Sequence, residues 1–239
     1  MDQLKVVFIV PSFNISTNIS KLLESLTEQE NKSWECIIID DISTDDTWEN
    51  LKKHTDNDDR FSIIKNEEKK YALRNIIDHS RKLQFDENII IAVVDGDDSL
   101  CNPKAVDILL SEYEKGNQVV WTAHRWDTNG MNISGPIPHH VNPYFWPWRS
   151  SHLRTFKASL LSKVSDRNFK NIRGEWFKRG YDQALMLPLM HVADLFTYVP
   201  EVCYLYNIDS SSIPSEERNW CERDQISTIN FVRARGFVK

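Results

Sequence analysis

The chain has 239 residues and a formal net charge of −6, with no basic block, which argues against nucleic acid as its main partner. Only 7 residues are glycine, and their spacing allows neither a Rossmann fingerprint nor a Walker A loop, so a glycine-rich phosphate cradle is excluded. The 4 cysteines lie far apart and indicate neither zinc nor a disulfide framework. No apolar run approaches the ~18 residues of a transmembrane segment, and the N-terminus lacks a signal-peptide pattern. We therefore expect a cytoplasmic protein with reduced thiols.

Strand and helix patterns alternate through the first half of the chain. Continuous apolar runs predict buried strands, and apolar residues at helical spacing predict helices between them. The strands are expected at residues 4–10, 34–39, 61–64, 89–94 and 119–123, with helices at 15–26, from Thr44, at 71–83 and from Pro103. This order predicts an α/β fold with a doubly wound, mostly parallel sheet, in which ligands bind beyond the carboxyl ends of the strands.

The second half has a different character. Five of the 8 tryptophans fall between Trp121 and Trp176, and four prolines interrupt residues 130–149, which we expect to be an irregular loop. Beyond it we expect a helix at 181–194, a strand at 199–206, a mobile loop at 210–214 and a terminal helix at 217–232. No linker or repeat divides the chain, so a single domain is expected.

Acidic residues gather where predicted strands end. Asp40 and Asp41 follow the second strand, and the run Asp95-Gly96-Asp97-Asp98 follows the strongest one. Carboxylates suit Mg²⁺ or Mn²⁺, and such ions bind through few carboxylates together with substrate phosphates. An Asp-x-Asp at this place could therefore hold a metal against a diphosphate; the alternative is that Asp and Gly simply make the turn.

These segments together resemble a known family. The runs Val6–Asn14 and Ile37–Asp45, the pair Arg74-Asn75 and the run Val93–Asp98 are similar in order and spacing to glycosyltransferase family 2. Later, Gly180-Tyr181-Asp182 resembles the acidic catalytic motif of that family, which usually reads Glu-Asp, so that Tyr181 stands in the place of the Glu. The resemblance implies a GT-A fold that uses nucleotide sugars, with a nucleotide-sugar-binding half at 1–115 and an acceptor-binding half at 116–239.

The resemblance also implies roles for residues in the first half. Asp41 would accept a hydrogen bond from the nucleotide base, most often uracil in this family, and Asp95 would approach the ribose or the metal. Asp97 would bind the Mn²⁺ or Mg²⁺ ion directly. Further donor contacts are implied for Pro11, Ser12 and Asn14 at the edge of the nucleotide pocket and for Arg74 near the diphosphate. Taken alone, Arg74 is equally consistent with a solvated surface charge on a helix.

The second half would supply the base and the acceptor site. Asp182 is the expected general base, which would deprotonate the acceptor hydroxyl in a single displacement with inversion; it could instead be an acid that favours a helix start. Trp146, Trp148 and His152 could offer aromatic platforms for acceptor sugars or could pack a core lid. Asp209 occupies the place of a late histidine that often binds metal in the family.

The most consistent function is a metal-dependent, inverting transfer of one sugar from a UDP-sugar to an acceptor hydroxyl. The acceptor class (glycan, protein or small molecule) stays open. The Q-x-x-R-W signature of processive polymer synthases is absent, which predicts one sugar per encounter. A sugar-phosphate nucleotidyltransferase is an alternative, although its glycine-rich loop after the first strand is missing. A degenerate carbohydrate- or nucleotide-binding domain without turnover is the other.

Overall fold

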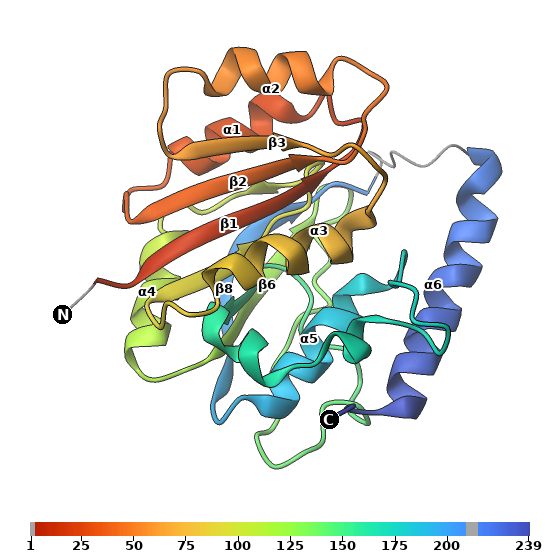
Figure 1. The fold of residues 1–239 in the computed structure, drawn as a ribbon. Helices are drawn as coiled ribbons and strands as arrows, with labels where there is room; N and C mark the ends of the chain where they lie inside the picture. The colour runs from red at the N-terminus through yellow and green to blue at the C-terminus, as the bar shows by residue number, and fades with distance from the viewer. Residues whose placement is uncertain (1–2, 209–214) are drawn as a thin grey trace.

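Eight strands form one sheet in the order β3-β2-β1-β4-β7-β6-β8-β5. Figure 1 shows β3, β2 and β1 side by side in this sheet. The computed structural model describes residues 3–208 and 215–239. The strands are β1 (Lys5–Ser12), β2 (Trp34–Asp40), β3 (Phe61–Lys65), β4 (Ile89–Val93), β5 (Ser99–Leu100), β6 (Val119–Trp126), β7 (Arg154–Lys157) and β8 (Phe196–Tyr206). Four of the seven strand pairs are parallel, and β1 lies between β2 and β4. The predicted α/β fold with a mostly parallel sheet is confirmed.

Two strands were not expected from the sequence. β7 inserts antiparallel between β4 and β6, with Arg154 opposite Val93 on one side and Trp121 on the other. Its four residues, Arg-Thr-Phe-Lys, carry too few apolar side chains to produce a strand pattern. β5 has only two residues and pairs with β8. Both strands are recognisable only through their partners.

Helices cover both faces of the sheet. They are α1 (Ile19–Thr27), α2 (Thr47–Thr55), α3 (Tyr71–Ser80), α4 (Ala105–Glu114), α5 (Tyr181–Val192) and α6 (Ser215–Arg235), with short 3-10 turns η1 (Arg81–Leu83), η2 (Ala158–Lys163) and η3 (Asp166–Phe169). Alternate residues of β1 face opposite layers: Phe8 packs in one cluster with α1 and α4, and Ile9 packs in another with α3 and α5. The sheet is therefore buried on both faces, as its apolar runs predicted.

Most of the expected elements of the second half are present. The predicted helix at 181–194 corresponds to α5, the strand at 199–206 to β8 and the terminal helix to α6. The expected loop at 210–214 and Asp209 lie outside the described residues. Among the helices of the described part, none combines the length and the apolarity required to cross a bilayer.

Candidate active site

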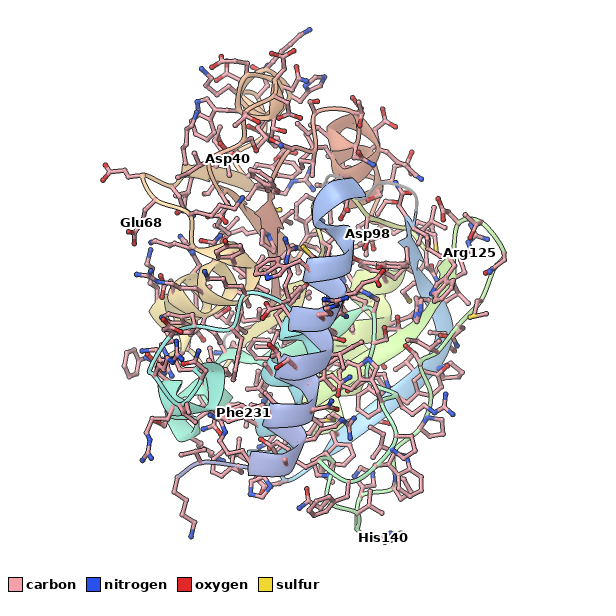
Figure 2. The ribbon with its side chains drawn as sticks, turned by 90° about the vertical axis from the view of Figure 1, so that its right-hand side faces the viewer. Asp40, Glu68, Asp98, Arg125, His140 and Phe231 are labelled. Carbon is pink, nitrogen blue, oxygen red and sulfur yellow. The ribbon has the colours of Figure 1, made fainter. Side chains whose placement is uncertain are left out.

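A cavity of about 590 Å³ opens at the carboxyl ends of β1, β2 and β4. The start of β7, the end of β8 and the starts of α3 and α5 also border it. Helix α6, which lies in front in the view of Figure 2, supplies a further wall. Its charged lining residues are Asp41, Asp95, Asp97, Asp182, Glu222, Lys69, Arg154, Lys178 and Arg179. Acids and bases thus converge from both halves of the chain on one cavity.

Parallel pairing brings the ends of three strands to the same edge. Ser12 pairs with Asp40 at the ends of β1 and β2, and the backbone N–H of Asp41 donates to the carbonyl of Ser12 at 2.8 Å. Gly96 lies so close to β1 that an added Cβ would stand 2.7 Å from Ser12 Oγ and 3.2 Å from the Pro11 carbonyl oxygen. Only glycine therefore lets the acidic loop approach the end of β1 this closely.

The carboxylate of Asp41 is fixed at the start of α3. Its oxygens accept hydrogen bonds from the backbone N–H groups of Lys70 and Tyr71, both at 2.8 Å, and from Asn66 Nδ2 at 2.7 Å. Burial alone would raise the pKa of Asp41, but these hydrogen bonds together hold it below its ordinary value. Asp41 is thus ionised and oriented at the cavity wall.

A tyrosine on β8 organises the acidic loop after β4. The backbone N–H of Asp95 donates to the hydroxyl of Tyr204 at 3.0 Å, and that hydroxyl donates to Asp98 Oδ2 at 2.7 Å. The backbone N–H of Asn207 donates to Asp98 Oδ1 at 2.8 Å. Burial, followed by the charges of Asp95 and Asp97, raises the pKa of Asp98 well above its ordinary value. The loop therefore concentrates negative charge that a cation would offset.

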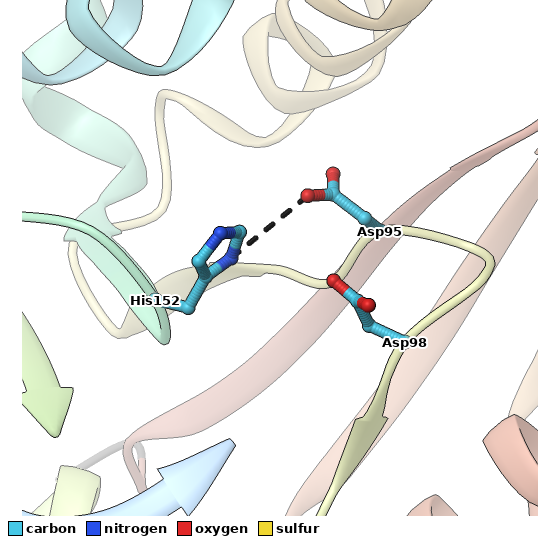
Figure 3. A group of neighbouring side chains, drawn as sticks. All are labelled: Asp95, Asp98 and His152. Atoms are coloured by element: carbon cyan, nitrogen blue, oxygen red, sulfur yellow. Dashed lines mark ion pairs between the residues drawn. The ribbon is translucent and has the colours of Figure 1, made fainter. Parts of the chain in front are cut away.

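His152 lies against this loop, as Figure 3 shows. Its ring stacks on Tyr204 and on Tyr206, with centroids 4.6 and 5.0 Å apart, and its Nδ1 lies 3.8 Å from Asp95 Oδ2. Burial, and after it the charge of Arg154, lowers the pKa of His152 well below its ordinary value, so the ring is neutral. Nδ1 is buried and has no hydrogen-bond partner among the described residues. Asp95, Asp98 and His152 each offer a ligand atom, all within 4.8 Å of one another.

Arg154 occupies the floor of the cavity. Its side chain is 2% exposed, and its Nη2 donates to Asp95 Oδ2 and to the Tyr181 hydroxyl, both at 2.9 Å. The Tyr181 hydroxyl in turn donates to Asp95 Oδ1. Burial alone would lower the pKa of Arg154, but Tyr181 and Asp95, and more weakly Tyr204 and Asp182, raise it above its ordinary value. The guanidinium is therefore a permanent internal cation.

Asp182 lines the cavity from the first turn of α5. Its Oδ1 is buried and has no hydrogen-bond partner in the described part of the chain. Burial raises the pKa of Asp182 above its ordinary value, although Arg154 and the backbone N–H of Gln183 oppose this rise. A carboxylate with a raised pKa and an unused oxygen can accept a proton.

A group of cations lines the wall of the cavity near Asp41. Lys69 Nζ donates to the carbonyl of Asp41 at 3.0 Å and lies 3.6 Å from its Oδ2. Lys178 Nζ stands 5.2 Å from the ring centroid of Tyr71. Burial, and more weakly the charge of Arg179, lowers the pKa of Lys69, although Asp41 opposes this change. This wall could take an anionic group.

The structure brings together most of the predicted site residues. Those that line the cavity are Pro11, Ser12, Asp41, Asp95, Asp97, His152 and Asp182. His152, expected at the acceptor site, lies instead against the acidic loop, because the entry into β7 places it beside β4 and β8. Asp209 cannot be placed, since it lies outside the described residues.

Four predicted residues do not line the cavity. Asn14 Oδ1 accepts from the backbone N–H of Thr44 at 2.9 Å and so joins two loops beneath the cavity edge. Arg74 pairs with Glu68, which precedes α3, and with Asp78 on α3, and it does not reach the cavity. Trp146 and Trp148 pack, half-buried, against the core cluster of α3 and α5. This geometry agrees with the alternatives considered above: the two tryptophans pack against the core, and Arg74 is a surface charge.

Several charged and aromatic residues that line the cavity were not among the predicted site residues. Lys178 and Arg179 directly precede the Gly180-Tyr181-Asp182 motif, and this position was the only available signal. Lys69 falls in a charged loop and gives no periodic signal. Tyr206 ends the strand expected at 199–206, but its stacking on His152 depends on the pairing that brings β7 and β8 together.

Comparisons with known proteins agree with this geometry. Residues 7–178 match the profile of glycosyl transferase family 2. The chain is 32% identical over 221 residues to the UDP-Glc:alpha-D-GlcNAc-diphosphoundecaprenol beta-1,3-glucosyltransferase WfgD of Escherichia coli, an alignment that covers 91% of this chain and 82% of that protein. It is 28% identical over 208 residues to the chondroitin synthase of Escherichia coli, covering 82% of this chain but only 28% of the synthase.

A solved structure shares the fold. The crystal structure of S. aureus TarS 1-349 in complex with UDP-GlcNAc superposes with a TM-score of 0.69 at 16% identity, covering 99% of this chain and 68% of that one. At this identity the likeness concerns the fold alone, and it agrees with the expected GT-A architecture.

Proposed function

Because the chain belongs to glycosyl transferase family 2, we propose that it transfers a sugar from a UDP-sugar to an acceptor hydroxyl. One observation carries the proposal: a single cavity joins the oriented carboxylate of Asp41, the acidic loop after β4 and Asp182, whose Oδ1 has no hydrogen-bond partner among the described residues. Glycosyl transfer needs a nucleotide site, a means of stabilising the diphosphate and a base, and these three features can supply them.

The donor assignment rests on the first half of the chain. Asp41 presents an ionised carboxylate beside Pro11 and Ser12, which suits recognition of an imide N–H such as that of uracil. The relatives support a UDP-sugar, since WfgD is named for UDP-Glc and TarS was crystallised with UDP-GlcNAc. Lys69, Lys178 and Arg179 add positive charge on the same wall, where a nucleoside diphosphate would be attracted.

The residues present fit a divalent cation. His152 has a neutral ring and a buried Nδ1 without a partner among the described residues, and it lies with two carboxylates in one small group. Asp95, Asp98 and His152, together with Asp97 from the same loop, would hold Mn²⁺ or Mg²⁺. A bound cation would stabilise the negative charge of the departing diphosphate as a Lewis acid.

Asp182 would act as the general base. Its oxygen without a partner can take the proton of the acceptor hydroxyl while the bond between sugar and phosphate breaks. A carboxylate that deprotonates the acceptor, rather than attacking the sugar itself, produces a single displacement with inversion at the anomeric carbon. The absent signature of processive synthases supports transfer of one sugar per encounter.

A screen of nucleotide sugars with and without Mn²⁺ tests this function. We expect one UDP-sugar to raise the melting temperature in the presence of Mn²⁺ and, with an acceptor, to release UDP. Asp97→Asn should weaken the Mn²⁺-dependent shift, whereas Asp56→Asn, an exposed change at the end of α2, should leave it unchanged. Binding of a UDP-sugar without any release of UDP would favour the degenerate binding domain, and no shift with any nucleotide would exclude the proposal.

A further inference from the structure

Tyr181 and Arg154 link the two sides of the cavity. The acidic loop follows β4, and the proposed base lies in the first turn of α5. Asp95 and Asp182 are 87 positions apart in the chain. Apart from these two side chains, no hydrogen bond or ion pair within the described part of the chain joins Asp95 to the start of α5. These two side chains therefore connect the loop to the helix start.

The contacts form a closed triangle. Arg154 Nη2 lies 2.9 Å from Asp95 Oδ2 and 2.9 Å from the Tyr181 hydroxyl, and that hydroxyl donates to Asp95 Oδ1. Both oxygens of Asp95 are thus engaged, and the guanidinium also lies over the Tyr181 ring, 4.9 Å from its centroid. Three groups that each constrain the other two leave the carboxylate one orientation.

The triangle is largely shielded from solvent. The Arg154 side chain is 2% exposed and that of Asp95 21% exposed, so their attraction is screened much less than that of a surface pair. A charge buried in this way is costly to desolvate, and the neighbouring carboxylates must offset that cost. The arrangement stabilises the fold less than a hydrophobic core would, which favours a role in the reaction.

We propose that Arg154 and Tyr181 are positioning residues that hold the acidic loop after β4 and the start of α5 in a fixed relation, so that Asp182 meets the acceptor beside the bound donor. This inference rests on the proposed glycosyl transfer. Neither residue needs to touch a substrate. Tyr181 stands at the position where the family motif has a carboxylate. Its hydroxyl holds Asp95 by a hydrogen bond and adds no negative charge beside Arg154.

Tyr181→Phe is the main test, because it removes only the hydroxyl and keeps the ring. We expect kcat to fall by about 10- to 100-fold, the size of effect that a small misplacement of reacting groups produces, while the KM for the donor changes less than about threefold. Tyr113→Phe is the matched control: it removes a buried hydroxyl that bonds to Thr155 Oγ1 at 2.8 Å on the other face of β7. The control should leave both constants unchanged.

Arg154→Lys completes a double-mutant cycle with Tyr181→Phe. Lysine keeps the charge, but its ammonium cannot take the place of Nη2 and also present a planar group over the Tyr181 ring. We therefore expect kcat to fall in Arg154→Lys and to fall little further in the double variant. Multiplicative losses in the double variant would show that the two side chains act independently and would overturn the proposal. An unchanged kcat for Tyr181→Phe would also overturn it.

Mn²⁺ binding without donor, followed by electron paramagnetic resonance, gives a readout that is independent of turnover. Arg154→Gln should bind Mn²⁺ about tenfold more tightly, because a positive charge beside the acidic loop is removed, whereas Arg154→Lys and Tyr181→Phe should stay within about threefold of wild type. Weaker Mn²⁺ binding in all three variants would indicate a purely structural role and overturn the proposal. If wild type turns over no nucleotide sugar, the proposed function fails, and the Mn²⁺ titration alone decides whether Arg154 acts on the loop.

Discussion

Asp182→Asn tests the assignment of the base most directly. The substitution keeps the shape of the side chain and removes its ability to accept a proton. No hydrogen bond of Asp182 Oδ1 is lost, since that oxygen has no partner among the described residues. Because general base catalysis contributes about 10²- to 10⁴-fold, kcat should fall by that factor while the affinity for UDP stays within about twofold.

The same variant should be more stable than wild type at neutral pH. Burial raises the pKa of Asp182 in the folded protein above the ~3.9 of an unfolded chain. The favourable contribution of such a group is complete below its unfolded pKa and is lost as the pH rises through its folded pKa, because the charge is then buried. Asn resembles the protonated form, so each unit of raised pKa corresponds to about 1.4 kcal/mol of added stability in the variant at pH 7.

Two assays decide the outcome. Thermal unfolding between pH 4 and 8 should show the variant melting higher at neutral pH, by roughly 2–4 °C for each kcal/mol in a chain of this size, with the gap closing at acid pH. Release of UDP measured against pH should show a wild-type rate that falls as Asp182 becomes protonated and a residual rate in the variant without that fall. Turnover of Asp182→Asn within about twofold of wild type would refute the base, and a lower melting temperature at pH 7 would refute the account of its burial.

Three further substitutions test the support of the site. Gly96→Ala should destabilise the fold by about 1–3 kcal/mol and weaken UDP binding, because its Cβ would meet Ser12 Oγ at 2.7 Å; calorimetry with and without UDP would detect this, and an unchanged melting curve would contradict it. Asp41→Asn should lower the free energy of unfolding by about 1–3 kcal/mol at pH 7, because the single oxygen of an amide cannot accept from two backbone N–H groups and Asn66 together. The pKa of Asp41 is lowered in the fold, so its contribution is present above its unfolded pKa and lost as the pH falls through the folded value; a cost independent of pH would argue against an ionised Asp41. Asn168→Ala should lower the free energy of unfolding by about 1–3 kcal/mol without changing UDP affinity, because among the described residues its side chain bonds only to Val238 and to Ser165 in its own turn. Weakened UDP binding would show that the segment around Val238 reaches the site.

Most of the helices and strands, and the edge of the sheet where the candidate site lies, could be predicted from the sequence. Hydrophobic periodicity is a local property, so apolar runs such as 89–94 and amphipathic helices such as 15–26 identify themselves without their partners. Parallel strands end at the same edge of a sheet, and for that reason acids placed directly after two strands, such as Asp41 and Asp95, were expected at one cavity.

The tertiary structure alone decided which side chains complete the cavity. β7 has no periodic signal of its own, and only its pairing between β4 and β6 carries Arg154 and His152 to the acidic loop. The direction of a helical side chain likewise depends on its neighbours, so Arg74 turns to surface carboxylates. Contacts between distant segments are set by strand pairing and packing, which a local sequence pattern does not encode. The composition excluded a glycine-rich phosphate loop, and only the tertiary structure showed that acids, cations and a histidine gather at the carboxyl ends of the strands.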